Sequence, residues 1–301
     1  MKHPSKGGIP VNAELKNAIK ATDSKAEYDT SAKRLLGQKS ILAHILVKTV
    51  DEFKGMDPKK VVDSIEGTPH IGTVPVELGL TNAVSEKNGE RLVGFNTENG
   101  EVNEGLIRFD IVFYVRMKDG LSQIIINVEA QKDEPNGYEI LNRAIFYVSR
   151  LISSQKERDF ENSSYDDIKR VYSIWICMNM KENTMSYVHL TKEDLIGSYE
   201  WKGNLDLLNI IMIGLAKKLP EHDETYELHR LLGALLSQDL TVDEKLNIIG
   251  NEYDIPIEEN FRKDVSVMCN LSQGIEEKGI AIGEAGLIVK MYKNGFTSYE
   301  I

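Results

Sequence analysis

Apolar residues recur with a helical period in two long segments of the chain. They fall every three or four residues between Gln38 and Phe53, and again between Tyr138 and Gln155. This spacing gathers apolar side chains on one face of an α-helix and leaves the other face polar. The pattern therefore predicts two amphipathic helices.

Alternation between an apolar face and a more polar face marks two strands between these helices. It runs from Ile107 to Val115 and again from Gln123 to Gln131, and such alternation is typical of half-buried strands. Asp119-Gly120 lies between the two segments, and this pair favours the two-residue turn of a β-hairpin. The resulting register predicts that Asp110 directly faces Glu129.

A third apolar pattern, without alternation, runs from Val171 to Met178. A short continuous apolar run rich in β-branched and aromatic residues is typical of a strand buried on both faces. We also expect a short strand at Arg91 to Phe95. The predicted order from Gln38 to Met178 is therefore helix, three strands, helix and strand.

Beyond Asn204 the pattern changes, and we expect helices at Leu205 to Leu219 and at Tyr226 to Leu236. The whole pattern predicts an α/β (α+β) fold with an all-helical C-terminal appendage. The expected divisions are a flexible leader at residues 1–25, a core domain at residues 26–200 and a helical region at residues 201–301.

Charge and cysteine content narrow the classes of protein. The chain has 47 acidic and 36 basic side chains and a net charge of −11, which excludes a protein whose whole surface binds nucleic acid. Residues 1–60 nevertheless hold 12 basic and 7 acidic side chains, so a local basic face remains. The two cysteines, Cys177 and Cys269, exclude a disulfide scaffold and favour a reducing, cytoplasmic compartment. No apolar stretch reaches the roughly 18 residues of a membrane span.

The predicted facing pair of carboxylates, Asp110 and Glu129, needs a countercharge, because directly opposed like charges destabilise a hairpin. One source is a neighbouring cation such as Arg108, which the same register places opposite Gln131. Another is a divalent metal ion, since magnesium is typically held by one or two carboxylates. Two neighbours on this face, Val112 and Ile125, are apolar, which favours the metal ion over a fully solvated surface.

Asp110, a hairpin and then Glu129-Ala130-Gln131 at the end of an apolar strand resemble the PD-(D/E)XK nuclease core. More narrowly, they resemble the recombination-promoting nuclease/putative transposase (Rpn) family, often labelled PD-(D/E)XK nuclease family transposase. The strings that carry the resemblance include YDTSAKRLL from residue 28, RFDIVFYV from residue 108, INVEAQ from residue 126 and GYEILNRAIFYVSRLISSQ from residue 137. The ending GFTSYEI resembles the opening of a further helical motif in that family, so we expect a longer full protein.

The resemblance implies a magnesium- or manganese-dependent DNA endonuclease that hydrolyses phosphodiester bonds and promotes recombination, with residues 26–200 as its nuclease-like domain. It makes Asp110 and Glu129 metal ligands, with the backbone carbonyl of Ala130 a third candidate. Gln131 completes the implied catalytic set, where the wider superfamily has a lysine. Glutamine can orient a water or a phosphate oxygen, but it carries no charge. The alternative is a degenerate nuclease fold that acts as a DNA-binding or protein-interaction module.

Other residues are weaker candidates. Glu52, at the end of the first helix, could supply a third carboxylate, or it could be a solvated charge at a helix end. Arg143, Tyr147 and Arg150 share one stripe of the second helix and could contact DNA. Alternatively, Arg143 pairs with Glu139 and Tyr147 packs with its hydroxyl at the surface.

The basic front of the chain holds a cluster that could touch DNA or could be an ordinary solvated face; its members are Lys33, Arg34 and Lys39. The C-terminal helices are the candidate surface for a homo-oligomer.

Overall fold

The structure is a computed structural model that describes residues 28, 30–71, 85–87, 90–92, 98–101, 105–108, 111–116, 123–131, 139–156, 160 and 162–270. The chain divides into two compact units. One unit comprises residues 33–237 and 247–256, and the other comprises residues 1–32, 238–246 and 257–301. The predicted flexible leader, residues 1–25, lies outside the described residues.

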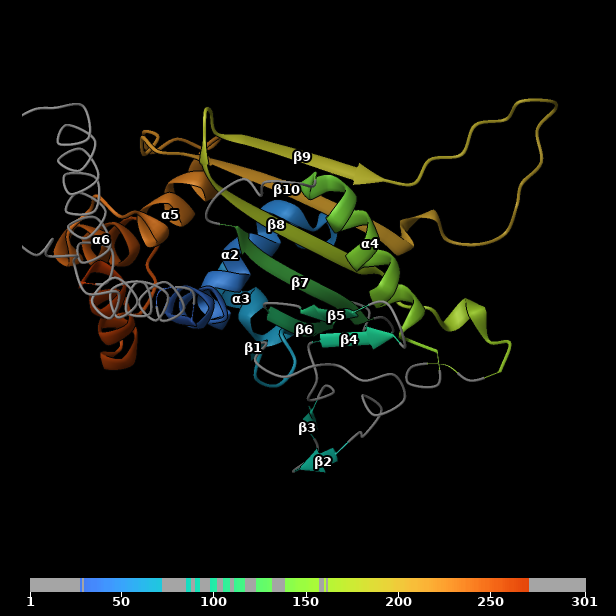
Figure 1. Ribbon diagram of the computed structural model, residues 1–301, viewed down its shortest axis with the longest axis horizontal. Helices are drawn as coiled ribbons and strands as arrows, with labels where there is room; N and C mark the ends of the chain where they lie inside the picture. The colour runs from blue at the N-terminus through green and yellow to red at the C-terminus, as the bar shows by residue number, and fades with distance from the viewer. Residues whose placement is uncertain are drawn as a thin grey trace, which may run out of the picture. The chain divides into compact units, whose positions relative to one another are not determined.

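A mixed six-stranded sheet forms the centre of the first unit (Figure 1). In spatial order its strands are β1 (His70–Ile71), β6 (Ile111–Arg116), β7 (Gln123–Gln131), β8 (Val171–Met180), β10 (Leu208–Ala216) and β9 (Thr184–His189). The three central strands, β7, β8 and β10, are parallel to one another, and the outer strands pair with them or with β6 in the antiparallel sense.

Two small hairpins accompany this sheet. The first pairs β2 (Ser85–Lys87) with β3 (Glu90–Leu92), and the second pairs β4 (Glu98–Glu101) with β5 (Gly105–Arg108). The strand predicted from Ile107 to Val115 is therefore two strands that belong to different sheets. Arg108 pairs with Glu98 of β4, and the predicted pairing of Arg108 with Gln131 is not found among the described strand pairs.

The helices in order are α2 (Lys39–Thr49), α3 (Pro58–Val61), α4 (Ile140–Ser153), α5 (Glu227–Leu236) and α6 (Val242–Asn247). Single helical turns are η1 (Asp51–Phe53), η2 (Val62–Ser64), η3 (Tyr165–Asp167), η4 (Leu205–Leu207) and the π-helical η5 (Ile248–Glu252). Residues 30–36 and 259–270 are also helical. Both predicted helices are present, as α2 and α4, and α4 is amphipathic as predicted. No residue of α2 is exposed, so α2 is a buried helix rather than an amphipathic one. Among the described residues, no helix combines the length and the apolar character that crossing a membrane requires.

The two faces of the sheet are covered by different helices: α4 lies on the near face in the view of Figure 1, and α2 lies behind the sheet. Along β8 the buried side chains alternate between the faces. Trp175 and Cys177 join the core under α4, together with Ala144, Val148 and Leu151 of that helix. This sandwich of helix, sheet and helix buries both faces of the central strands, which explains why the first seven residues of β8 are buried and nearly all apolar.

The prediction of an all-helical C-terminal appendage is wrong. Residues predicted as a helix from Leu205 to Leu219 instead form β10, which inserts between β8 and β9 and completes the sheet. Periodicity does not separate a strand buried on both faces from a buried helix, and β10 is such a strand. Its isoleucines, with their branched Cβ atoms, favour the strand. The mixed α/β class is correct, and the predicted domain limits stay a prediction.

Candidate functional site

The hairpin register, on which the candidate site depends, is confirmed. Strands β6 and β7 pair from Arg116 with Gln123 at one end to Ile111 with Val128 at the other, without a shift. The turn and the alternation predicted this register. Asp110 precedes Ile111 by one residue and lies outside the described residues.

Strand β7 also pairs with β8 on its other side. Glu129 pairs with Trp175, Ala130 with Ile176 and Gln131 with Cys177, in a parallel ladder. The positions of the predicted catalytic triplet thus lie beside the middle of β8. Sequence reasoning missed Trp175 as a neighbour of the site, because a parallel pairing between segments this far apart leaves no local signal.

Helix α4 places a cation over Trp175. The guanidinium carbon of Arg143 lies 5.4 Å from the Trp175 ring centroid and 4.7 Å from that of Tyr147. Arg143 Nη2 donates a 2.6 Å hydrogen bond to the Tyr147 hydroxyl, and the two rings are 5.6 Å apart. Cations are attracted to aromatic faces at these distances. The structure therefore brings together Arg143, Tyr147, Trp175 and, through the strand register, position 129.

The other members of the predicted DNA-contacting stripe are buried. Tyr147 is 7% exposed and Arg150 is 8% exposed, and burial lowers the pKa of the Arg150 guanidinium. Tyr147 packs in the core between α4 and the sheet, and the burial of both side chains places them badly to reach a phosphodiester backbone. The Tyr147 ring packs in the core, as the alternative expected, and its hydroxyl accepts the hydrogen bond from Arg143.

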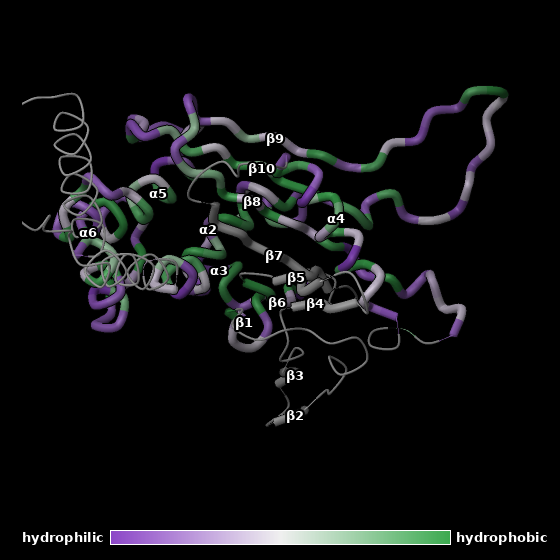
Figure 2. The backbone as a smooth tube through the Cα atoms, in the orientation of Figure 1, coloured by the Kyte–Doolittle hydropathy of each residue, from purple (hydrophilic) through white to green (hydrophobic). Residues whose placement is uncertain are grey.

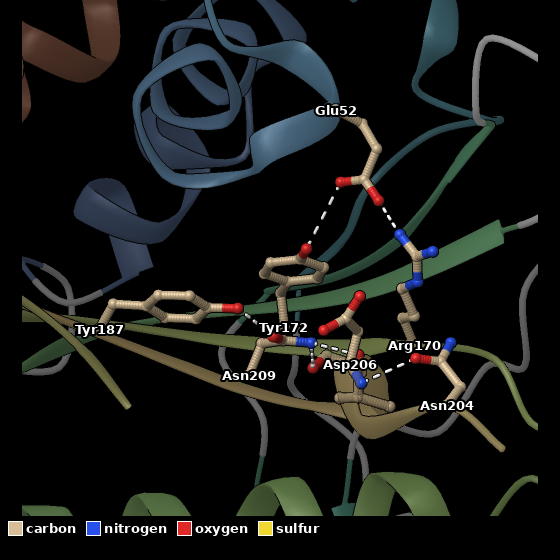
Figure 3. A network of polar contacts seen from close by, with 8 residues as sticks. Glu52, Arg170, Tyr172, Tyr187, Asn204, Asp206 and Asn209 are labelled. Atoms are coloured by element: carbon tan, nitrogen blue, oxygen red, sulfur yellow. Dashed lines mark hydrogen bonds and ion pairs between the residues drawn. The ribbon is translucent and has the colours of Figure 1, made fainter. Parts of the chain in front are cut away.

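Glu52 does not join this arrangement. It forms an ion pair with Arg170, and the Tyr172 hydroxyl donates a 3.4 Å hydrogen bond to its second oxygen (Figure 3). Tyr172 stands near the start of β8 and alternates in facing with Trp175, so Glu52 lies on the opposite side of the sheet from α4. The structure assigns Glu52 to an ion pair rather than to a shared site with Glu129.

The polar network around Glu52 continues toward β10. The Tyr187 hydroxyl donates to the side chain of Asn209, whose amide in turn donates to the backbone oxygen of Asp206 at 2.6 Å (Figure 3). Burial raises the pKa of Tyr172 and of Tyr187. Both phenols act as hydrogen-bond donors in this network.

Gly37, which lies between Arg34 and Lys39 of the predicted basic cluster, is close to the start of β6. Gly37 packs close to Ile71, since a Cβ atom at Gly37 would lie 3.4 Å from that side chain, and Ile71 pairs with Ile111. Arg34 is exposed. Lys39 instead donates a 2.9 Å hydrogen bond to the backbone oxygen of Ile65. Of the predicted basic cluster, Arg34 is therefore exposed and Lys33 is half-buried, whereas Lys39 is held by a hydrogen bond within the fold.

Within the part of the chain that the structure describes, no three histidine, cysteine, aspartate or glutamate side chains gather as a metal site. This finding does not concern Asp110 and Glu129, the two carboxylates predicted as ligands, because their side chains lie outside the described part of the chain.

Comparison with known proteins adds independent support. A family model described as PD-(D/E)XK nuclease family transposase matches residues 90–267, which is more than half of the chain. That segment contains β6, β7, α4, β8 and β10, the elements that surround the candidate site. No curated protein and no solved structure matches the chain. The chain therefore belongs to the PD-(D/E)XK nuclease family transposases, as the resemblance predicted.

Proposed function

We propose that this chain is a metal-dependent DNA endonuclease whose site forms where the β6–β7 hairpin opens away from its turn. The observation that carries the proposal is the unshifted register of that hairpin, which ends with Ile111 facing Val128. One further step of the same ladder would place Asp110 opposite Glu129. Facing positions of an antiparallel pair have Cβ atoms about 5 Å apart, close enough for two carboxylates to share an ion.

The pairing with β8 supports the choice of face. Residues that pair directly in a sheet present their side chains to the same face. Because Trp175 faces α4, we expect Glu129 and Gln131 to do the same. This orientation would bring the carboxylate toward Arg143, whose guanidinium stacks near Trp175. The guanidinium would then contact the DNA phosphate on which the site acts.

The donor set fits magnesium or manganese, because both prefer oxygen ligands and neither needs a closed protein cage. Asp110, Glu129 and the backbone carbonyl of Ala130 would hold the ion. When bound, such an ion lowers the pKa of a coordinated water and offsets the charge that develops on phosphate. Gln131 would orient the attacking water or a phosphate oxygen through its amide.

The basic front of the chain would position the DNA backbone beside this site. Arg34 is exposed, and the segment that follows it packs against β1 at the Asp110 end of the sheet. Promotion of recombination, a cytoplasmic location and a homo-oligomer formed through the C-terminal helices complete the proposal. They rest on the family and on the sequence.

Plasmid nicking tests the proposal. The full chain with magnesium or manganese should convert supercoiled plasmid to open-circle or linear forms, and a chelator should stop the reaction. Asp110→Asn and Glu129→Gln should each lower the rate at least ~1000-fold, because each removes a charged metal ligand. Glu182→Gln, a matched change at an exposed position, should leave the rate unchanged.

The result that sinks the proposal is a wild-type chain that cuts no faster than Asp110→Asn under every metal tested. If that chain still shifts DNA in a gel, it would be the degenerate nuclease fold that binds DNA without cutting it. The missing superfamily lysine at Gln131 makes this second outcome a concrete alternative.

A further inference from the structure

Strand β9 forms an unusually open edge of the six-stranded sheet. It pairs with β10 on one side and stands last in the strand order. Five of its six residues are exposed, and its sequence TMSYVH contains no proline and no lysine, arginine, aspartate or glutamate. Soluble proteins normally protect long edge strands with such residues, because an open edge pairs readily with another strand. The opposite edge, β1, has only two residues and is protected by its shortness.

A long exposed arm continues directly from this edge. We define the arm as residues 190–204, between β9 and η4, and every one of these residues is exposed. Figure 1 shows it extending away from the sheet, and Figure 2 shows that its far end is hydrophobic. Its most exposed large side chains are Ile196 at 98%, Leu195 at 86%, Trp201 at 76% and Tyr199 at 66%.

The root of the arm is fixed on both sides. At its start, Tyr187 of β9 donates a hydrogen bond to Asn209 of β10. At its end, Asn204 caps η4 by accepting a 2.7 Å hydrogen bond from the backbone of Asp206 (Figure 3). Within the arm, the Tyr199 and Trp201 rings pack edge to face with centroids 4.9 Å apart. The arm that carries these apolar side chains is therefore held by hydrogen bonds at both ends and by one ring contact within it.

The exposed apolar area is of the size that an interface needs. The four arm side chains, with Met185 and Tyr187 of β9, expose on the order of 700 Å² if each large side chain offers about 150–200 Å² in full. A stable interface buries about 800 Å² on each partner, whereas an ordinary surface rarely carries one apolar patch of several hundred Å².

The charge of the arm and of β9 argues against nucleic acid and against an anionic membrane as the partner of this surface. The arm has two lysines and three acidic residues, and β9 has no charged residue other than its histidine. Such a surface lacks the excess of basic side chains that nucleic acid or an anionic membrane attracts. A second copy of this chain needs no such charge, because an antiparallel strand edge is complementary to itself under a twofold rotation.

We propose that two copies of this chain dimerise through antiparallel pairing of their β9 strands, which joins the two sheets into one. This pairing satisfies the outer backbone groups of β9 in both copies. It also brings the start of each arm beside Thr184 of the partner subunit. The arm can then cover apolar side chains of the other copy and remove its own from water. This proposal is independent of the proposed nuclease activity and uses a different surface from the C-terminal helices.

Light scattering on the full chain over a concentration series tests the proposal. The wild type should change from monomer to dimer as concentration rises. Met185→Lys and Ser186→Lys, which add charge to opposite faces of β9, should each raise the dimer dissociation constant at least ~10-fold, because a lysine on an edge strand opposes pairing and the twofold axis brings the lysines of the two copies close together. Trp201→Ser should raise it by a smaller factor. Ser163→Lys, at an exposed position outside the sheet, is the matched control and should leave it unchanged.

Cross-linking checks the strand pairing without relying on affinity. Ser186→Cys or Tyr187→Cys, near the centre of β9, should yield a disulfide-linked dimer under mild oxidation, because the native Cys177 and Cys269 are buried. Ser163→Cys should not. A chain that stays monomeric at all concentrations overturns the proposal. A dimer that neither lysine variant weakens overturns it as well, because that dimer would use another surface.

Discussion

An arginine lies near each face of β8, and the two arginines differ in what they contact. On the face away from α4, Arg170 forms an ion pair with Glu52, whose side chain is 18% exposed. On the α4 face, Arg143 stacks on Tyr147 and Trp175. The contact of Arg170 is therefore with an opposite charge, whereas that of Arg143 is with two neutral rings. We propose that Arg170 stabilises the fold and that Arg143 contacts the DNA phosphate.

The largest effect is expected from replacing, one at a time, Glu129 on the α4 face and Glu52 on the opposite face. Glu129→Gln should reduce metal-dependent plasmid cleavage at least ~1000-fold, because the proposed ligand loses its charge. Glu52→Gln should keep the cleavage rate within about threefold of the wild type, since Glu52 lies across the sheet from position 129. Equal losses of cleavage rate in the two variants would contradict the assignment of Glu52 and position 129 to opposite faces of the sheet.

For the free energy of unfolding we expect the reverse order, with a larger loss in Glu52→Gln than in Glu129→Gln. Glu52→Gln leaves Arg170 without its anionic partner in a half-buried position, and we expect the free energy of unfolding to fall by about 1–2 kcal/mol. The measurement is urea denaturation followed by circular dichroism. The double variant Glu52→Gln with Arg170→Gln isolates the pair, because its loss should be smaller than the sum of the single losses. Additive losses would show that the pair contributes nothing beyond its separate members.

Local patterns were sufficient for the hairpin at the centre of the candidate site. Alternation assigned the faces of β6 and β7, and the Asp-Gly turn fixed which residues meet, so the register from Ile111 to Arg116 could be predicted. The same local logic failed at Arg108. Alternation continues through that residue, but it does not say with which strand a segment pairs, and Arg108 pairs with Glu98 instead of Gln131.

Contacts between distant segments could not be predicted. Glu52 and Arg170 are 118 residues apart, and the stacking of Arg143 on Trp175 depends on the packing of α4 against β8. Neither follows from a spacing within one helix or strand. The strand β10 was missed for a related reason, because its continuous apolar pattern reflects burial on both faces by neighbours that lie far away in the sequence.

The role assigned to Arg143 can be separated from general packing by its salt dependence. Arg143→Gln should weaken DNA binding and cleavage about tenfold, and it should reduce the slope of log affinity against log salt by about 1, because one phosphate contact is lost. Arg170→Gln is the matched control on the other face. It should lower stability and leave the salt slope unchanged. A slope that changes equally in both variants would remove the distinction between the two arginines.

The smallest effect is expected from Tyr147→Phe, which keeps the ring beneath Arg143 and removes the hydroxyl that accepts its 2.6 Å hydrogen bond. The free energy of unfolding should fall by about 0.5–1.5 kcal/mol, the ordinary net contribution of such a bond. Cleavage should fall by no more than about threefold, because the stack on Trp175 still orients the guanidinium. A loss as large as that of Arg143→Gln would mean that the hydroxyl, rather than the aromatic platform, holds the cation in place. The difference between the two faces of β8 would then rest on one hydrogen bond.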